Sequence, residues 1–218
     1  MTEMQYKHWK SQGLCMKAYA LYQMSLIWGD IPVQNSIPPA ITAENVEEVY
    51  FEYYPPRTSK DDVYQQLIEE LTWATQNGPE VDHSNKYLLS KAFAHGMLAR
   101  VYAEKSAHQD WNKVAEHCEI VEGMGFTLCE DYGQMWAYDD NDAVRNTSES
   151  IFEVTWTRDN GNWIWMMYHR NYYDPNNSYT WIKWITPSRD LIAAYDAEGD
   201  TEIANACITY DQTGTDPN

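Results

Sequence analysis

Apolar residues recur every three to four positions along the first half of the chain, which is the spacing of one helix face. Residues 4–28 are the first segment with this pattern, and they predict a long helix. Gly29-Asp30 and Pro32 follow immediately and predict where it ends. Two neighbouring apolar stripes run along this helix: Leu14, Ala18 and Leu21, and beside them Cys15, Tyr19, Tyr22 and Leu26.

A second amphipathic segment follows a long connection. Residues 31–57 contain five prolines among mixed polar residues and predict an irregular segment that carries function or wraps a surface. Ser59 is the expected N-cap of the next helix, with Asp62 near its positive end. Asn77-Gly78-Pro79 predicts a left-handed C-cap. The expected buried face consists of Val63, Leu67, Leu71 and Ala74.

Two further helices are predicted at 86–105 and from Trp111 onward, separated by the short gap 107–110. This closely joined antiparallel pair resembles a tetratricopeptide unit. One unit cannot bury its own apolar face, so the earlier helices are expected to stack on it. The first helix carries a small-residue seam of Ala92, Gly96, Ala99 and Ala103, and the second a face of Trp111, Val114, Ala115, Cys118 and Val121.

The second half of the chain has a different character. Residues 126–129 and the alternating segment 151–157 predict short strands, and 159–186 predicts an irregular, aromatic-rich segment. Pro187-Ser188 predicts the start of a last helix through about Tyr195, with Leu191 and Ala194 facing inward. The chain is therefore expected to form one mainly α domain over 1–218, with helical pairs at 4–125 and a strand and loop region with a terminal helix at 126–218.

Charge and hydropathy narrow the function classes. Lys and Arg number 15 against 33 Asp and Glu, a net charge of -18, so nucleic acid and anionic lipid are disfavoured as partners. No run approaches the roughly 18 apolar residues of a membrane span, and the first residues lack a signal-peptide core, so the chain reads as soluble. The widely spaced cysteines favour buried free thiols, with a disulfide as the alternative: Cys15, Cys118, Cys129 and Cys207.

The aromatic residues favour types with polar tips, since 10 Trp and 17 Tyr stand beside 4 Phe. Five of the tryptophans lie within 156–184, interleaved with Asn and Arg. Aromatic planes can stack on sugar rings, while amide and guanidinium groups can form hydrogen bonds with the sugar hydroxyls. This window therefore predicts a ligand platform. The alternative is that these aromatics fasten a loop onto the helices. The candidate ligand-binding residues are Trp163, Trp165, Tyr168, Arg170, Tyr172, Tyr173, Asn176, Tyr179, Trp181 and Trp184.

Other chemistry is weakly indicated. Residues 139–142 offer oxygen ligands for calcium but lack the turn glycine and distant Glu of a helix-loop-helix site, so a solvated acidic loop is the preferred interpretation. His117 and its neighbour Cys118 point apart, and His95 is interpreted as a packed or surface histidine. No nucleophile elbow, P-loop, HExxH or GxGxxG motif occurs, so neither an enzyme nor a bound cofactor or metal is expected.

Four ordered stretches resemble the SusD/RagB family of nutrient-binding lipoproteins. The first runs from Cys15 to Val33 and contains Trp28-Gly29-Asp30-Ile31-Pro32. The later ones are Ser59 to Pro79, Lys86 to Trp136 with Leu98-Ala99-Arg100-Val101-Tyr102, and Asn146 to Trp156 with Ser148-Glu149-Ser150-Ile151-Phe152-Glu153. Pro187-Ser188 and Gly199-Asp200 resemble the next landmark.

The resemblance implies a tetratricopeptide-like protein at the extracellular face of the outer membrane. Such proteins are lipid-anchored and cover a SusC-like TonB-dependent transporter, to which they deliver oligosaccharides. Family members are about twice this length and begin with a lipoprotein signal, so we expect an internal fragment or a truncated member that lacks the anchor. The alternatives are a tetratricopeptide-like scaffold for protein partners and, less favoured, a glycoside hydrolase, for which Glu149 and Glu153 would be the tempting carboxylates.

Overall fold

The computed structural model describes residues 1–135, 146–154 and 187–207, and these residues are mainly helical, as the sequence predicts. The chain divides into two compact units. The first consists of Met1–Thr127 and Ser148–Glu153, and the second of Leu128–Thr147 and Val154–Asn218. Each unit is described by itself below.

The first helix, α1 (Glu3–Trp28), begins at a capping box in which Thr2 Oγ1 accepts from the Gln5 amide and Gln5 Oε1 accepts from the Thr2 amide. The predicted inward stripes are partly wrong. Tyr19 and Leu26 are both 44% exposed, and two small polar residues take part in the buried face instead. Serines fit where neighbouring helices approach closely. The buried residues are Ser11, Cys15, Ala18, Leu21, Tyr22 and Ser25.

Helix α3 (Lys60–Asn77) confirms the predicted N-cap and buried face. Ser59 Oγ accepts from the Asp62 amide, and the predicted face is buried together with Tyr64. The predicted left-handed C-cap is wrong, because Gly78 is extended with φ -74° and ψ 170°. The following Pro79 explains this, since a residue before proline is driven away from helical conformations.

Helices α4 (Lys91–Ala103) and α5 (Trp111–Glu122) form the predicted antiparallel pair. α4 begins five residues later than predicted, at the N-cap Ser90. The shared apolar face predicted for α5 is only partly turned inward: Val114 and Val121 are half-buried together with His117, whereas Trp111, Ala115 and Cys118 are exposed. The apolar spacing therefore identified the helix and two of its inner residues.

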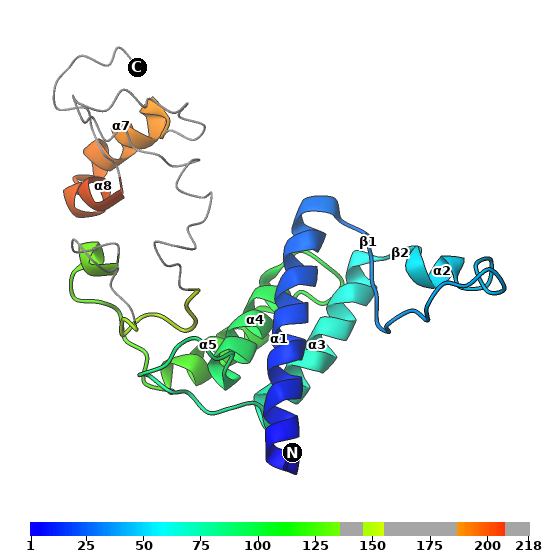
Figure 1. Ribbon diagram of the computed structural model, residues 1–218. Coiled ribbons are helices and arrows are strands. Elements are labelled where there is room, and N and C mark those ends of the chain that lie inside the picture. Colours follow the sequence, from blue (N-terminus) through cyan, green and yellow to red (C-terminus); the bar gives the residue numbers. More distant parts are fainter. Residues whose placement is uncertain (136–145, 155–186, 208–218) are drawn as a thin grey trace, which may run out of the picture. The chain divides into compact units, whose positions relative to one another are not determined.

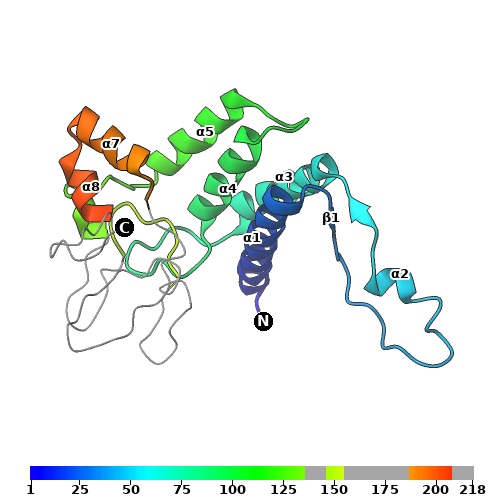
Figure 2. The same cartoon turned by 90° about the horizontal axis from the view of Figure 1, so that it is seen from above.

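The core of the first unit lies between α1, α3 and α4, which pack against one another, and α5 packs on α4 (Figure 1). Seen from above, α3 lies between the loop that carries α2 and helix α4 (Figure 2). The largest fully buried side chains are Tyr64, Ile31, Leu67, Leu71, Leu98, Val63 and Val101.

The proline-rich connection between α1 and α3 is closed at its base by a short antiparallel pairing. Strand β1 (Ile31–Pro32) pairs with β2 (Arg57–Thr58), in the register Ile31 with Thr58 and Pro32 with Arg57. The single-turn helix α2 (Tyr50–Tyr53) lies within the loop, away from the helical scaffold (Figure 1). We call residues 31–58 the α2 loop.

The two segments predicted as strands do not form strands where they are described. Residues 126–129 and 151–154 instead make isolated backbone bonds, from the Thr127 amide to the Ser148 carbonyl and from the Glu153 amide to the Lys86 carbonyl. Phe152 packs edge-on against Phe93, with ring centroids 5.4 Å apart. Phe152 thus anchors this segment on α4 without a sheet, while Val154 is exposed.

The described part of the second unit contains a 3-10 turn, η1 (Tyr132–Met135), and helices α7 (Arg189–Glu198) and α8 (Thr201–Cys207). Ser188 caps α7 as predicted, and Gly199 ends it in the left-handed conformation with φ 70°. The predicted inward residues are wrong, since Leu191 and Ala194 are exposed whereas Ile192 and Tyr195 are half-buried. Asp200 then begins α8, accepting from the Ile203 amide.

Candidate functional site

The ten ligand-binding residues predicted from the sequence, Trp163 to Trp184, lie outside the residues that the structure describes. The acidic segment 139–142 does so too. The aromatic platform therefore remains a prediction, and the described residues supply a different candidate site.

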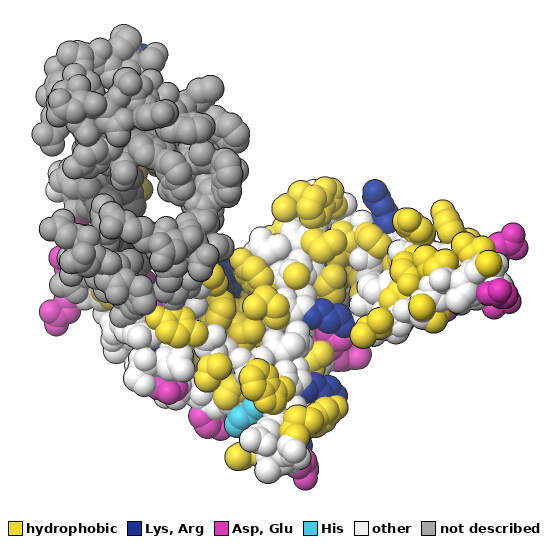
Figure 3. Space-filling model, in the orientation of Figure 1, with side chains coloured by type: hydrophobic (Ala, Val, Ile, Leu, Met, Phe, Trp, Pro, Cys, Tyr) yellow, Lys and Arg dark blue, Asp and Glu magenta, His cyan; other side chains and the backbone are white. Residues whose placement is uncertain are grey.

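That site is a group of exposed aromatic side chains on and beside α2, which we call the α2 aromatic surface: Tyr50, Phe51, Tyr53 and Tyr54. Their exposed fractions are 53%, 71%, 39% and 68%. Figure 3 shows hydrophobic side chains gathered over this loop, with acidic side chains at its outer end. Large aromatic residues grouped in solvent are unusual, because each leaves favourable burial unused.

The rings of this surface are ordered against one another. Tyr50 lies between its two neighbours, edge-on to Phe51 at 5.3 Å and tilted by 32° to Tyr54 at 5.1 Å between ring centroids. The single helical turn explains the arrangement, since residues four apart in a helix lie on one face. The outer faces of Phe51 and Tyr54 remain open to a ligand.

The α2 loop holds its shape through internal hydrogen bonds. Asn45 Oδ1 accepts from the Thr42 amide at 2.7 Å, and Asn45 Nδ2 donates to the Ala40 carbonyl at 3.0 Å. The Tyr53 hydroxyl donates to the Pro39 carbonyl at 2.8 Å, which ties α2 back to the opposite side of the loop. Val49, 5% exposed, is a buried side chain at the start of α2.

The base of the loop is attached to the helical scaffold. Asn35 Oδ1 accepts from Lys17 Nζ of α1 at 2.9 Å and from Gln66 Nε2 of α3 at 2.8 Å. Lys17 also pairs with Glu70 at 2.6 Å. Asp30 Oδ1 accepts from the Lys60 amide at the other stem. Rigid helices therefore fix the positions of both ends of the loop.

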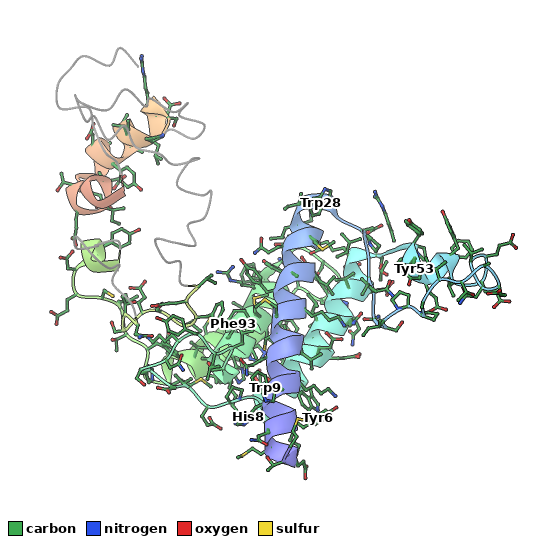
Figure 4. The ribbon with its side chains drawn as sticks, viewed as in Figure 1. Tyr6, His8, Trp9, Trp28, Tyr53 and Phe93 are labelled. Carbon is green, nitrogen blue, oxygen red and sulfur yellow. The ribbon has the colours of Figure 1, made fainter. Side chains whose placement is uncertain are left out.

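An open hollow of about 420 Å³ lies beside α2. Its lining is mainly apolar but includes the amide of Gln34, whose Nε2 donates to the Ser36 carbonyl at 2.7 Å. Figure 4 labels Tyr53, which contributes to this lining from α2. Rings beside a few polar groups are the composition that small-ligand sites use. The lining residues are Pro32, Gln34, Pro38, Tyr53 and Pro55.

The charge of the α2 loop is strongly acidic. Four glutamates, Glu44, Glu47, Glu48 and Glu52, stand against the single cation Arg57. A hydrogen bond from Thr42 holds the pKa of Glu44 below its ordinary value, so this carboxylate is ionised at neutral pH. The surface is therefore suited to a neutral ligand and repels an anionic one.

A larger hollow of about 490 Å³ lies where the start of α1 meets the end of α3 and the start of α4. Its charged groups are already paired, Lys7 with Glu3 at 2.9 Å and Lys91 with Glu80. It has no exposed aromatic ring in its lining. It is the weaker candidate for a sugar-sized ligand.

The cysteines and histidines contribute little to either hollow. Cys15 is buried, as predicted, and burial raises the pKa of its thiol to about 12, whereas Cys118 is exposed. His95 is not an isolated histidine: it contacts His117 across the interface between α4 and α5. Within residues 1–135, 146–154 and 187–207, no three His, Cys, Asp or Glu side chains group as metal ligands. Among the same residues, no helix is long and apolar enough to cross a membrane.

Comparison with known proteins shows which family the helical scaffold is similar to. A family model for SusD-like proteins, described as starch-binding and associating with the outer membrane, matches residues 1–103. A SusD-like protein of Bacteroides ovatus is 27% identical over 158 residues, which are 67% of this chain and 26% of that protein. Over these residues the chain is similar to SusD-like proteins. It spans about a quarter of the length of this SusD-like relative.

Solved SusD-like structures share the fold. The crystal structure of a SusD-like protein from Bacteroides fragilis NCTC 9343 matches with a TM-score of 0.53 and 21% identity, over 72% of this chain and 29% of that one. A second solved structure matches with a TM-score of 0.52 and 24% identity, over 69% and 29%. The helical architecture expected from the resemblance is confirmed.

Proposed function

We propose that this chain is a non-catalytic, glycan-binding part of a cell-surface nutrient-uptake protein, and that its α2 aromatic surface contacts a neutral oligosaccharide. The full-length protein would present this glycan to a SusC-like TonB-dependent transporter. The observation that carries the proposal is the group of exposed tyrosines on a loop whose two ends are fixed to buried helices. The description of the matched family, starch-binding at the outer membrane, supports it.

The chemistry of sugars suits this surface. A pyranose ring has an apolar C–H face that packs on an aromatic plane, while its hydroxyls require hydrogen-bond partners. The open faces of Phe51 and Tyr54 offer such planes. The hydroxyls of Tyr50 and Tyr54 and the amide of Gln34 provide polar partners around them. The predicted window Trp163 to Trp184 is proposed as a glycan contact in its own right.

Binding without hydrolysis is supported by the ionisation of the carboxylates. A glycosidase needs one carboxyl group whose pKa is raised, so that it can act as an acid near neutral pH. In the described part of the chain, each carboxyl group with a shifted pKa is shifted downward, as at Glu44 and Glu116. These groups are suited to remain ionised rather than to donate a proton.

Calorimetric titration with a panel of oligosaccharides tests the proposal. Neutral α- and β-glucans and mannans should include at least one ligand, and Tyr54→Ala and Phe51→Ala should each weaken its binding. Loss of one stacking plane is worth about 1 kcal/mol, or roughly five-fold in affinity.

The matched control is Trp9→Ala. Trp9 is 68% exposed like Tyr54, but it lies on α1 near the N-terminus, far along the scaffold from α2 (Figure 4). It should leave glycan affinity unchanged. Equal affinity of the parent and both α2 variants would contradict the role of the α2 aromatic surface.

A protein-binding scaffold is the second candidate, favoured by the outer face of α1. Trp9, Met16 and Ile27 follow one another at helical spacing and are 68%, 51% and 68% exposed. An apolar stripe of this kind suits a protein partner better than a sugar. If this candidate were correct, Trp9→Ala would weaken capture of the transporter while the α2 variants would not.

A further inference from the structure

Two histidines from different helices face each other at the surface of the first unit. His95 of α4 and His117 of α5 have their Nδ1 atoms 3.0 Å apart and their ring centroids 5.1 Å apart. The tight connection between the helices, in which the Asp110 amide donates to the Tyr102 carbonyl, places them in register. The ring of Tyr102 stacks on His117, 5.8 Å away and inclined by 18°.

The two nitrogens are close enough to bind one metal ion together. Two nitrogens bonded at about 2.0–2.1 Å and at a right angle are about 2.9 Å apart, whereas a tetrahedral angle separates them by about 3.4 Å. The present 3.0 Å spacing is that of the hydrogen bond between them, and a small turn of the rings reaches either value. Tetragonal N and O sites are typical of Cu²⁺ and Ni²⁺, which imidazole nitrogen binds well.

A hydrogen bond already joins the two Nδ1 atoms. Burial is the main cause that holds the pKa of both imidazoles below the ordinary histidine value. One Nδ1 now donates to the other. If that proton moves to Nε2 of the same ring and the rings turn slightly, both Nδ1 lone pairs become available without a net release of protons.

The charged groups around the pair are nearly balanced. Glu116 of α5 acts on both histidines and favours a cation there, while Lys91 of α4 and Lys113 of α5 oppose it. Lys113 is itself paired with Glu116 at 2.7 Å. The neighbouring Glu116 carboxylate offsets part of the charge of an arriving ion.

We propose that His95 and His117 form a two-histidine chelate for a divalent copper or nickel ion, which bridges α4 and α5 with water completing the coordination. Both side chains are half-buried rather than enclosed, so an ion can enter from solvent. Because the ligands come from different helices, the bound ion would fasten α5, the least buried helix of the first unit's scaffold, to α4.

Titration of the intact chain with NiCl₂ at pH 7.5 tests this, with nickel chosen because it does not oxidise the exposed thiol of Cys118. The parent should bind one nickel ion and unfold at a higher temperature in its presence. His95→Gln and His117→Gln should each weaken that binding at least ten-fold and abolish the thermal shift. His8→Gln, a change at a half-buried histidine of α1, should behave like the parent.

Electron paramagnetic resonance of the copper-loaded protein provides a second readout, in a Cys118→Ser background that removes the thiol copper would oxidise. In this background an imidazole nitrogen of each histidine should couple to the copper, and one should remain when His95→Gln or His117→Gln is added. Nickel binding of equal strength in the parent and in both histidine variants would overturn the chelate. So would a copper spectrum of Cys118→Ser that lacks the two-nitrogen coupling.

Discussion

Two tyrosine pairs of the first unit have similar ring geometry and opposite environments. Tyr22 and Tyr64 stack with centroids 6.1 Å apart at 28° and are 7% and 0% exposed. Tyr50 and Tyr54 lie 5.1 Å apart at 32° and are 53% and 68% exposed. The first pair joins α1 to α3, with the Ser25 hydroxyl donating to the Tyr22 carbonyl at 2.7 Å and accepting from the Tyr64 hydroxyl at 3.2 Å, whereas the second joins nothing to the scaffold.

The difference separates residues that hold the fold from residues that are available to a ligand. Burying an aromatic side chain removes about 150–250 Å² from water, so the inner pair contributes to stability. The outer pair keeps most of that surface wet and contributes little. When a sugar packs on these exposed rings, the water that hydrates them is released. The predictions below test this division between buried and exposed aromatic residues.

The largest effect is expected from Tyr64→Ala. Removing a fully buried ring leaves a cavity among α1, α3 and α4, so the free energy of unfolding should fall by about 3–5 kcal/mol. Urea unfolding followed by circular dichroism measures this. The paired Tyr54→Ala should change the value by less than about 0.5 kcal/mol. Similar losses in both variants would break the division between the two pairs.

Gly78 and Gly13 give a second contrast, between a crowded position and one that is open to solvent. A Cβ at Gly78 would lie 2.6 Å from Ser11 Oγ and 2.8 Å from the Ala74 carbonyl, so Gly78→Ala should destabilise by about 1–3 kcal/mol. Gly13, in the middle of α1, has nothing within 4 Å of such a Cβ. Gly13→Ala should therefore stabilise by about 0.5–1 kcal/mol through helix propensity. Thermal unfolding should show shifts of opposite sign.

Sequence patterns predicted where the helices lie more accurately than which side of each helix is buried. Ser59 and the stripe from Val63 to Ala74 identified α3 closely, because capping and helical spacing are local properties. The predicted apolar face of α5 was right only at Val114 and Val121, and the inward residues of α7 were assigned one stripe away. Which stripe is buried depends on neighbours that lie far off in the sequence. The alternation at 151–154 imitated a strand because Phe152 packs on α4 without a partner strand.

The candidate site was predicted only in part. The five prolines of residues 31–57 indicated a functional irregular segment, and this segment carries the α2 aromatic surface. The run Tyr50-Phe51-Glu52-Tyr53-Tyr54 was the available signal, since so many aromatics within a proline-rich loop cannot all reach the core. The pairing of His95 with His117 depends on the packing of α4 on α5, which no local pattern encodes.

The buried thiol of Cys15 predicts a smaller, pH-dependent effect. Burial raises the pKa of this thiol from its ordinary value of 9.0 to about 12, so folding favours the protonated thiol. Its contribution to stability is therefore complete below pH 9 and is lost progressively from pH 9 to 12. At pH 10 the loss should be about 1.4 kcal/mol. Urea unfolding measures the free energy of unfolding at pH 8 and at pH 10. This free energy should fall between the two pH values in the parent, and it should fall less in Cys15→Ala.

A small effect is expected at the base of the α2 loop. Asn35→Ala removes the acceptor for Lys17 and Gln66, which should cost about 1 kcal/mol of stability. Hydrogen exchange should quicken for residues 31–58 while α3 stays protected. Glycan affinity should fall as well, since the aromatic rings lose their fixed support. Unchanged exchange in the loop would show that this attachment does not order it.

The central claim, that the exposed tyrosines and not the buried ones contact the ligand, is tested most directly by hydroxyl-radical footprinting with and without a bound neutral oligosaccharide. The account predicts that saturating glycan lowers the oxidation of Tyr50, Phe51 and Tyr54 several-fold, while Trp9 on α1 keeps its rate. Oxidation of these α2 residues that does not change at full occupancy would contradict it.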